Sequence, residues 1–185
     1  MKTIDFLDKN TFLVLESLLN KNYYLRELAE ETNLAPSSVH KITTRLIKKN
    51  IILTKTQKNR KILKLNYNSP LARKAISIIF VDKLMNCRAF TKLTKLKLRG
   101  VYLFGSANRG TVTTNSDIDL AVFFEEKPDL IELSTVKREL SKEIRRDVQL
   151  VTLTNEKIKS MKKENIELLN QIKYKSTTLW GEELE

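Results

Sequence analysis

Residues 105–110 read Gly105-Ser106-Ala107-Asn108-Arg109-Gly110, and five residues later the chain continues Ser116-Asp117-Ile118-Asp119-Leu120-Ala121-Val122. The apolar, aromatic and β-branched residues 101–104 predict a buried strand before this run, and Gly105 lets the backbone approach a ligand closely. On the next strand, alternation places Asp117 and Asp119 on one face, about 7 Å apart at a rise of about 3.3 Å per residue. Like charges at this spacing repel each other. They therefore predict a cation between them, and an oxygen-only site completed by phosphate and water suits Mg²⁺ or Mn²⁺.

The same residues carry a family resemblance. The chain resembles the nucleotidyltransferase superfamily of DNA polymerase β, and most closely its minimal nucleotidyltransferase branch, whose signature is Gly-Ser, about ten residues, and Asp-x-Asp. Here these are Gly105-Ser106, residues 107–116 and Asp117-Ile118-Asp119. The Arg109-Gly110 and Ser116 positions also match, and the ending 178–182 is similar to the family's tail, so the resemblance covers residues 96–182.

Two alternatives bear on this motif. A β-hairpin with an acidic tip would explain the acids without any ligand. A P-loop is excluded, because no Gly-Lys-Ser/Thr follows Gly105.

The resemblance implies metal-assisted transfer of a nucleotidyl group from a nucleoside triphosphate, with ATP as the expected substrate. Gly105 and Ser106 would cradle the phosphates, with Arg109 and Ser116 as further nucleotide-binding candidates. Asp117 and Asp119 would be the metal ligands and catalytic carboxylates.

The third strand departs from the family pattern. Family members usually carry a third carboxylate there, which shares a metal and accepts the proton of the attacking hydroxyl. In this chain Gln149 stands at that position, and a neutral amide cannot accept the proton. Asp147 lies two residues earlier on the same strand face, so we predict that Asp147 substitutes for it as the third catalytic residue.

Charge divides the chain unevenly. The total formal charge is +12, but residues 1–99 hold 21 Lys/Arg against 7 Asp/Glu, whereas residues 100–185 hold 13 against 15. No acidic residue occurs between Thr32 and Val81, a stretch with eleven Lys/Arg. Such a basic field predicts a nucleic-acid partner, with a membrane surface as the less favoured alternative.

The amino-terminal segment predicts helices over residues 11–19, 24–32 and 37–50, then strands over 51–55 and 62–67 joined by a basic hairpin. This order resembles the winged helix-turn-helix domains of transcription regulators. In such domains the helix after the turn enters the major groove, and wing cations contact phosphates. The expected DNA-binding residues share an exposed position on that helix or wing: Ser37, Ser38, His40, Lys41, Thr44, Arg45, Lys58, Arg60 and Lys61. The alternative that this helix-turn-helix fold contacts another protein instead of DNA stays open.

The connecting segment 71–97 predicts one long helix or two. Apolar residues between Ala75 and Met85 cover most of its circumference, so the helix must be buried on more than one side. It is either packed between domains or paired with its copy, and we expect a homodimer.

The second half predicts helices over 130–144 and 157–174 and a third strand over 147–153. The fold class is therefore α+β: a winged helix-turn-helix domain (1–69), a connecting helix (70–97), and a small nucleotidyltransferase domain (98–185) with a mixed sheet and flanking helices. Cys87 is the only cysteine, which excludes an internal disulfide and any Cys/His zinc spacing, and we expect Cys87 to pack within a helix. With no signal peptide and no apolar run of about 20 residues, the protein is expected to be cytoplasmic, without a membrane partner.

The expected function is a DNA-binding nucleotidyltransferase that transfers AMP from ATP to a protein or small-molecule hydroxyl. Minimal nucleotidyltransferases often act as antitoxins that adenylylate a partner toxin, so the resemblance implies duplex DNA, nucleotide and a cognate toxin as partners. The alternatives are a transcription regulator whose nucleotidyltransferase fold is catalytically degenerate, and an RNA-modifying transferase. The low aromatic content disfavours the RNA enzyme.

Overall fold

A computed structural model describes residues 8–57, 60–164 and 166–184 of this chain. Contacts divide the chain into two compact units: Met1–Ile79 with Gly110–Thr114, and Phe80–Arg109 with Asn115–Glu185. None of the helices within the described ranges is long and apolar enough to cross a membrane.

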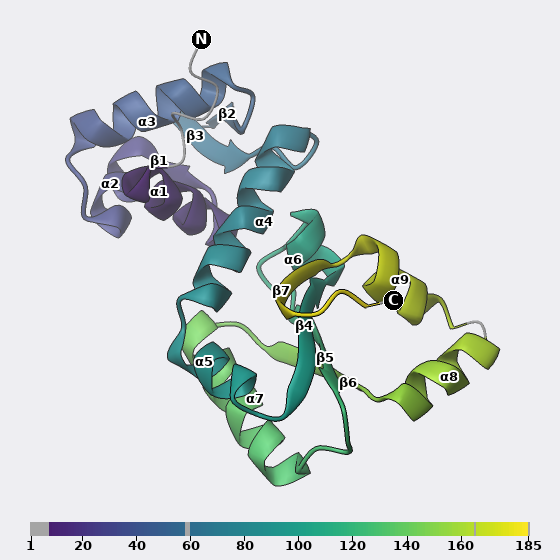
Figure 1. The fold of residues 1–185 in the computed structure, drawn as a ribbon. Coiled ribbons are helices and arrows are strands. Elements are labelled where there is room, and N and C mark those ends of the chain that lie inside the picture. Colours follow the sequence, from purple (N-terminus) through teal and green to yellow (C-terminus); the bar gives the residue numbers. More distant parts are fainter. Residues whose placement is uncertain (1–7, 58–59, 165, 185) are drawn as a thin grey trace. The chain divides into compact units, whose positions relative to one another are not determined.

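The first unit holds three helices and a small antiparallel sheet of order β1-β3-β2 (Figure 1). Its elements are α1 (Lys9–Asn20), β1 (Tyr23–Tyr24), α2 (Leu25–Thr32), α3 (Pro36–Lys48), β2 (Ile52–Gln57) and β3 (Arg60–Leu65). The three helices and the sheet close over apolar side chains that are fully buried, such as Leu15, Leu28 and Leu46. Asn33 ends α2 in a left-handed conformation with φ 52°, which allows the sharp turn before Pro36 opens α3.

The second unit is built on a mixed sheet of order β6-β5-β4-β7, in which only β5 and β6 are parallel. Its elements are α5 (Arg88–Thr94), β4 (Leu98–Phe104), α6 (Gly105–Arg109), β5 (Ile118–Phe124), α7 (Leu130–Ile144), β6 (Val148–Leu153), α8 (Asn155–Lys163), α9 (Glu167–Lys175) and β7 (Thr177–Gly181). Figure 1 shows α5 and α7 on one side of this sheet and α8 and α9 on the other. The architecture is α+β with helices flanking a mixed sheet, as expected.

One core cluster defines the sheet face covered by α8 and α9. It joins Tyr102 and Phe104 of β4 to Ala121 and Phe123 of β5. The helices contribute Ile158, Met161, Leu169 and Ile172. Since Asp119 shares the two-residue alternation of Ala121 and Phe123, its side chain lies on this same face.

Helix α4 (Pro70–Met85) joins the two units in sequence. The connecting segment is two helices, because α4 ends at Met85 and α5 begins at Arg88. Cys87 is buried between them and caps α5 rather than lying within a helix, since its Sγ accepts a hydrogen bond from the Phe90 N–H.

Two predicted elements differ in the second unit. The small-residue run that opens at Gly105, for which no helix was predicted, is a one-turn helix, α6. The expected helix 157–174 is two helices, because α8 is capped at Glu164 and Ile166 is extended. Both short helices place apolar side chains on the same sheet face. The ending 178–182, for which no element was predicted, overlaps β7.

Candidate active site

The acidic pair lies where β4 ends and β5 begins. Phe104 is the β4 partner of Asp119, so Gly105, the next residue, lies directly against the Asp119 side chain. Gly105 has φ +68°, and a Cβ atom at this position would overlap the Asp119 carboxylate. Glycine is therefore required here for both its backbone conformation and its lack of a side chain.

The carboxylates are held at an electrostatic cost. Burial raises the pKa of Asp119, the neighbouring Asp117 carboxylate raises it further, and Arg109 opposes both effects. A bound cation would relieve this repulsion, and Mg²⁺ is commonly held by one or two carboxylates together with substrate phosphates. The residues present therefore fit a divalent ion with a triphosphate. Among the described residues, no group of three or more His, Cys, Asp or Glu side chains is arranged to hold a metal.

Helix α6 is fixed at its middle by Asn108. The Asn108 amide donates to the Lys175 carbonyl at 2.7 Å, and its Oδ1 accepts from the Thr177 hydroxyl at 2.6 Å. These bonds tie α6 to the end of α9 and the start of β7. Asn108 stands within the sequence motif, but no role was predicted for it, because its hydrogen-bond partners are 67 and 69 residues away in the chain.

The other predicted nucleotide-binding residues surround this point. Ser106 is half-buried on α6, and Arg109 is exposed at the end of that helix. Ser116 is half-buried before β5, and its carbonyl accepts from the Arg146 guanidinium at 3.3 Å.

The third strand position is occupied by Gln149. Residue 149 is the β6 partner of Asp119, and the Gln149 amide donates to Asp117 Oδ2 at 3.4 Å. Its Oε1 accepts from the Lys137 ammonium at 3.4 Å. Asp147 precedes β6 and is exposed, and its carbonyl accepts from the Ile118 N–H at 2.8 Å. Sequence reasoning missed Lys137, because nothing in a helix pattern shows that this lysine reaches the edge strand.

Residues 88–178 match the family model of polymerase beta, nucleotidyltransferase. The chain is also similar to the protein adenylyltransferase MntA of Shewanella oneidensis, with 34% identity over 85 residues that cover 46% of this chain and 55% of MntA. The chain thus spans about half the length of this curated relative. Both matches support a nucleotidyltransferase, the enzyme class expected from the motif. We refer to residues 88–178 as the matched segment.

Solved structures give similar matches. One is a toxin–antitoxin structure with AMP-PNP, with 32% identity, coverage of 52% of this chain and 74% of that chain, and a TM-score of 0.41. Another is a mutant of the toxin–antitoxin MntA–HpeT, with 27% identity, coverage of 55% and 73%, and a TM-score of 0.42.

Outside the matched segment, the predicted DNA-binding residues that the structure describes lie on α3 and β3. Ser37, His40, Lys41, Arg60 and Lys61 are exposed, while Ser38, Thr44 and Arg45 are half-buried. Lys58 lies outside the described residues. A shallow pocket of about 520 Å³ on α3 is lined by His40, Lys41, Thr44, Arg45, Lys48 and Lys49.

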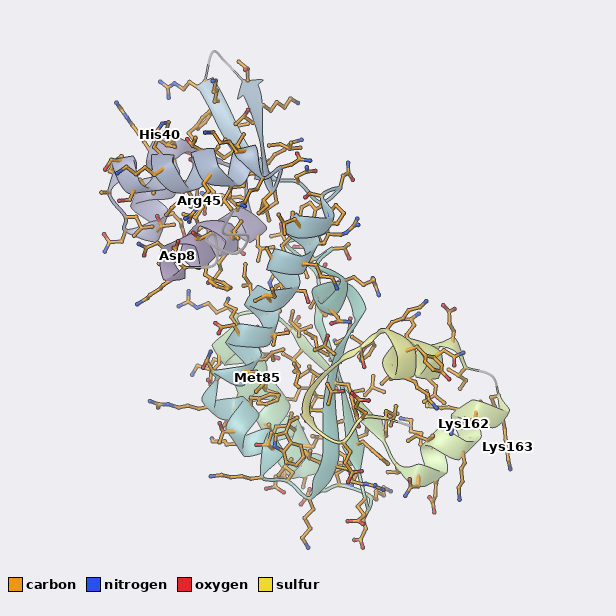
Figure 2. The ribbon with its side chains drawn as sticks, turned by 45° about the horizontal axis from the view of Figure 1, so that its top comes forward. Asp8, His40, Arg45, Met85, Lys162 and Lys163 are labelled. Carbon is orange, nitrogen blue, oxygen red and sulfur yellow. The ribbon has the colours of Figure 1, made fainter. Side chains whose placement is uncertain are left out.

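Arg45 is engaged inside its own unit. Its guanidinium forms an ion pair with Asp8 at 2.8 Å and donates to the Thr11 hydroxyl at 2.7 Å. Figure 2 shows Asp8 and Arg45 together, with His40 on the far side of α3. This geometry gives Arg45 a role in joining α1 to α3, in addition to its predicted contact with DNA.

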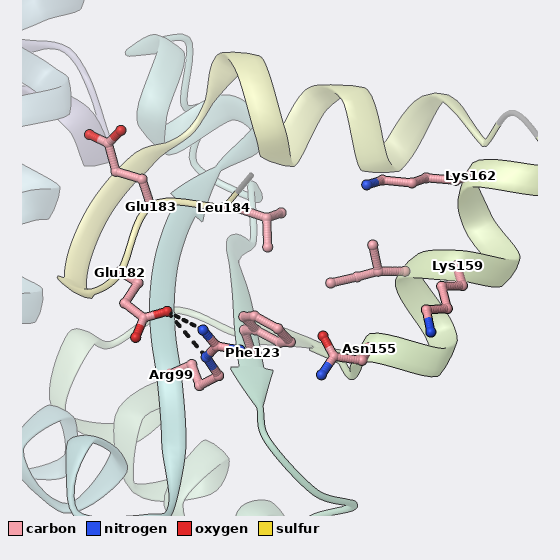
Figure 3. A pocket seen from close by; sticks show the side chains of 9 residues that line it. Arg99, Phe123, Asn155, Lys159, Lys162, Glu182, Glu183 and Leu184 are labelled. Carbon is pink, nitrogen blue, oxygen red and sulfur yellow. Dashed lines mark hydrogen bonds and ion pairs between the residues drawn. The ribbon is translucent and has the colours of Figure 1, made fainter.

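A second pocket, of about 490 Å³, lies at the opposite end of β4 and β5 from the acidic pair. Figure 3 shows Lys159 and Lys162 of α8 across from Arg99. The Arg99 guanidinium donates twice to Glu182, at 3.1 and 2.5 Å, and stacks over Phe123. Because Arg99 is already paired with Glu182, its charge is less available to a ligand in this pocket.

Proposed function

We propose that this chain is a metal-dependent nucleotidyltransferase that transfers AMP from ATP to a hydroxyl of a partner protein. The single observation that carries the proposal is the close approach of Gly105 to Asp119, which brings the start of α6 against a carboxylate pair. A triphosphate and a divalent ion need these two features side by side.

Each residue at the site has a chemical task in this proposal. Gly105 and Ser106 bind the β- and γ-phosphates through the backbone and the hydroxyl, and Arg109 offsets phosphate charge. Asp117 and Asp119 hold Mg²⁺ or Mn²⁺, and a bound ion neutralises charge that develops on the transferring phosphate. We propose Asp147 as the acceptor of the hydroxyl proton.

The acceptor is proposed to be a protein, specifically a cognate toxin. The printed activity of the MntA relative, protein adenylyltransferase, supports a protein hydroxyl as acceptor. The resemblance to minimal nucleotidyltransferases supports a toxin as the carrier of that hydroxyl.

The test is transfer of label from α-labelled ATP in the presence of Mg²⁺ and host lysate. We expect label on one protein with the wild-type chain and none with Asp117→Asn. ATP binding without any labelled protein, over a range of lysates that contain neighbouring gene products, would contradict the proposal.

For the first unit we propose a winged helix-turn-helix that binds duplex DNA. The order α1, β1, α2, α3, β2, β3, with the sheet order β1-β3-β2, supports it. In this proposal the α3 residues Ser37, His40 and Lys41 contact the major groove, and Arg60 and Lys61 contact phosphates. An electrophoretic shift titration at several salt concentrations tests this, because DNA binding through these cations must weaken steeply with salt.

The second candidate function is a transcription regulator whose nucleotidyltransferase fold is catalytically degenerate. Gln149 is the observation that favours it. An amide beside Asp119 in place of a carboxylate lowers the affinity of the site for a metal ion. In that case the chain would bind nucleotide without turnover, and Gln149→Asp would be expected to create transfer activity.

We also propose a homodimer formed through α4. Leu71, Ile78 and Met85 are 40%, 42% and 47% exposed, and their seven-residue spacing places them on one helix face. Other apolar residues of α4, such as Ile76 and Phe80, are buried within the chain. Light scattering of the wild type and Ile78→Lys tests this, with a dimer expected only for the wild type. A monomeric wild type would contradict it.

A further inference from the structure

The contacts of Gln149 bear on how many metal ions this site holds. A carboxylate can only accept hydrogen bonds and an ammonium can only donate them. The amide of Gln149 is therefore oriented by its neighbours: its NH₂ faces Asp117 and its carbonyl faces Lys137. Both contacts are 3.4 Å, at the long end for hydrogen bonds.

An acid at position 149 would behave differently. The substitution Gln149→Glu would put a third negative charge beside Asp117 and Asp119, since residue 149 is the strand partner of Asp119. Such a cluster supports two ions that share carboxylates, as in two-metal sites with ions about 3.5–4 Å apart. The neutral amide removes that charge.

Lys137 adds to the effect. Strand β6 lies at the edge of the sheet, so the side chain of Lys137 on α7 can reach Gln149. Its ammonium would repel a cation bound at position 149, because like charges repel one another over several ångströms even at an exposed contact such as this one. In addition, Arg109 lies close enough to oppose the raised pKa of Asp119. The two carboxylates are thus matched by two cationic side chains.

We propose that Gln149 and Lys137 exclude a second divalent ion, so that this site binds one. Gln149 withholds a carboxylate at the strand position beside Asp119, and Lys137 opposes a second ion by its charge. Asp147 serves in this proposal as the proton acceptor and not as a metal ligand. The inference rests on the proposed function, because it takes Asp117 and Asp119 as the ligands of the first ion.

The experiment counts Mn²⁺ bound per chain by electron paramagnetic resonance, with a non-hydrolysable ATP analogue present. We expect one ion for the wild type and one for Lys137→Met. Gln149→Glu, which keeps the side-chain length, is expected to bind a second ion weakly. In Gln149→Glu/Lys137→Met the second ion should bind roughly tenfold more tightly, which corresponds to about 1.4 kcal/mol for removal of one repelling charge.

The matched control is Lys142→Met in the Gln149→Glu background, because Lys142 is exposed on the same helix. It should leave the second Mn²⁺ unchanged. Circular dichroism of each variant verifies folding, and the ion count does not depend on turnover.

The outcomes separate the two proposals. Two ions on the wild type, or one ion on folded Gln149→Glu, would overturn this inference and leave the proposed transferase intact. Equal affinity of the second ion with and without Lys137 would overturn the role of Lys137. No Mn²⁺ on the wild type would overturn both the inference and the proposed function.

Discussion

The α3 surface and the acidic pair use charge in opposite ways. On α3 and the β3 hairpin, cations are spread over exposed positions such as Lys41, Arg60 and Lys61. At the acidic pair, two like charges are forced together and partly buried, with Gly105 against Asp119. A dispersed field depends on the number of charges, whereas a concentrated site depends on the position of single atoms. Substitutions should therefore act gradually in the first region and steeply in the second.

The steepest effect is expected for Gly105→Ala. The added Cβ would overlap the Asp119 carboxylate, and an L-residue at positive φ costs about 1–2 kcal/mol. Because a displacement of about 1 Å at a catalytic group can cost roughly 100-fold, we expect transfer to fall by at least this factor. Labelled-ATP assays and thermal melts measure both effects. The control for stability is Ser106→Ala, which should keep the wild-type melting temperature. Unchanged transfer in Gly105→Ala would contradict the steep response expected at the acidic pair.

The next effect concerns Asp147. If it accepts the proton of the attacking hydroxyl, Asp147→Asn should lower transfer by roughly 100-fold, the lower part of the range for general bases. The Mn²⁺ count and the binding of an ATP analogue should stay unchanged. Wild-type turnover in this variant would show that the proton goes elsewhere.

The first unit should respond in smaller, additive steps. Each of Arg60→Ala and Lys61→Ala removes one proposed phosphate contact, so the slope of log affinity against log salt should flatten by about 0.9 per substitution. Fluorescence anisotropy with duplex DNA measures this. The exposed Lys142→Ala is the control, and an all-or-none loss from one substitution would contradict a dispersed field.

The smallest effect is on stability. The pKa of Asp119 is higher in the folded chain than its unfolded value of 3.8, so its ionised form destabilises the fold at neutral pH. Asp119→Asn should therefore raise the melting temperature of the metal-free chain at pH 7. The difference should shrink as the pH falls through the folded pKa and vanish below 3.8, where the carboxyl is neutral in both states. Mn²⁺ should stabilise only the wild type. If Asp119→Asn melted at a lower temperature than the wild type at pH 7, ionised Asp119 would not destabilise the fold as stated.

Much of this followed from local pattern. The strand before Gly105, the helix 130–144 and the two-helix alternative for the connector agree with the structure, because alternation and helical spacing are properties of short segments. Asp119 lies on β5 as predicted, whereas Asp117 precedes that strand. The errors occurred where distant packing decides. The expected single helix 157–174 is two helices that both pack on the sheet face, and the pairing of residues 177–181 with β4 was not predicted.

The sequence by itself determined the acid pair, its glycine and the uneven charge, since these depend on residue identity and spacing alone. Only the tertiary structure decided that Gln149 faces both Asp117 and Lys137, that Asn108 anchors α6 and that Arg45 is held by Asp8. Each of these contacts joins residues from different elements, and such pairs are set by how helices and strands pack rather than by any local periodicity.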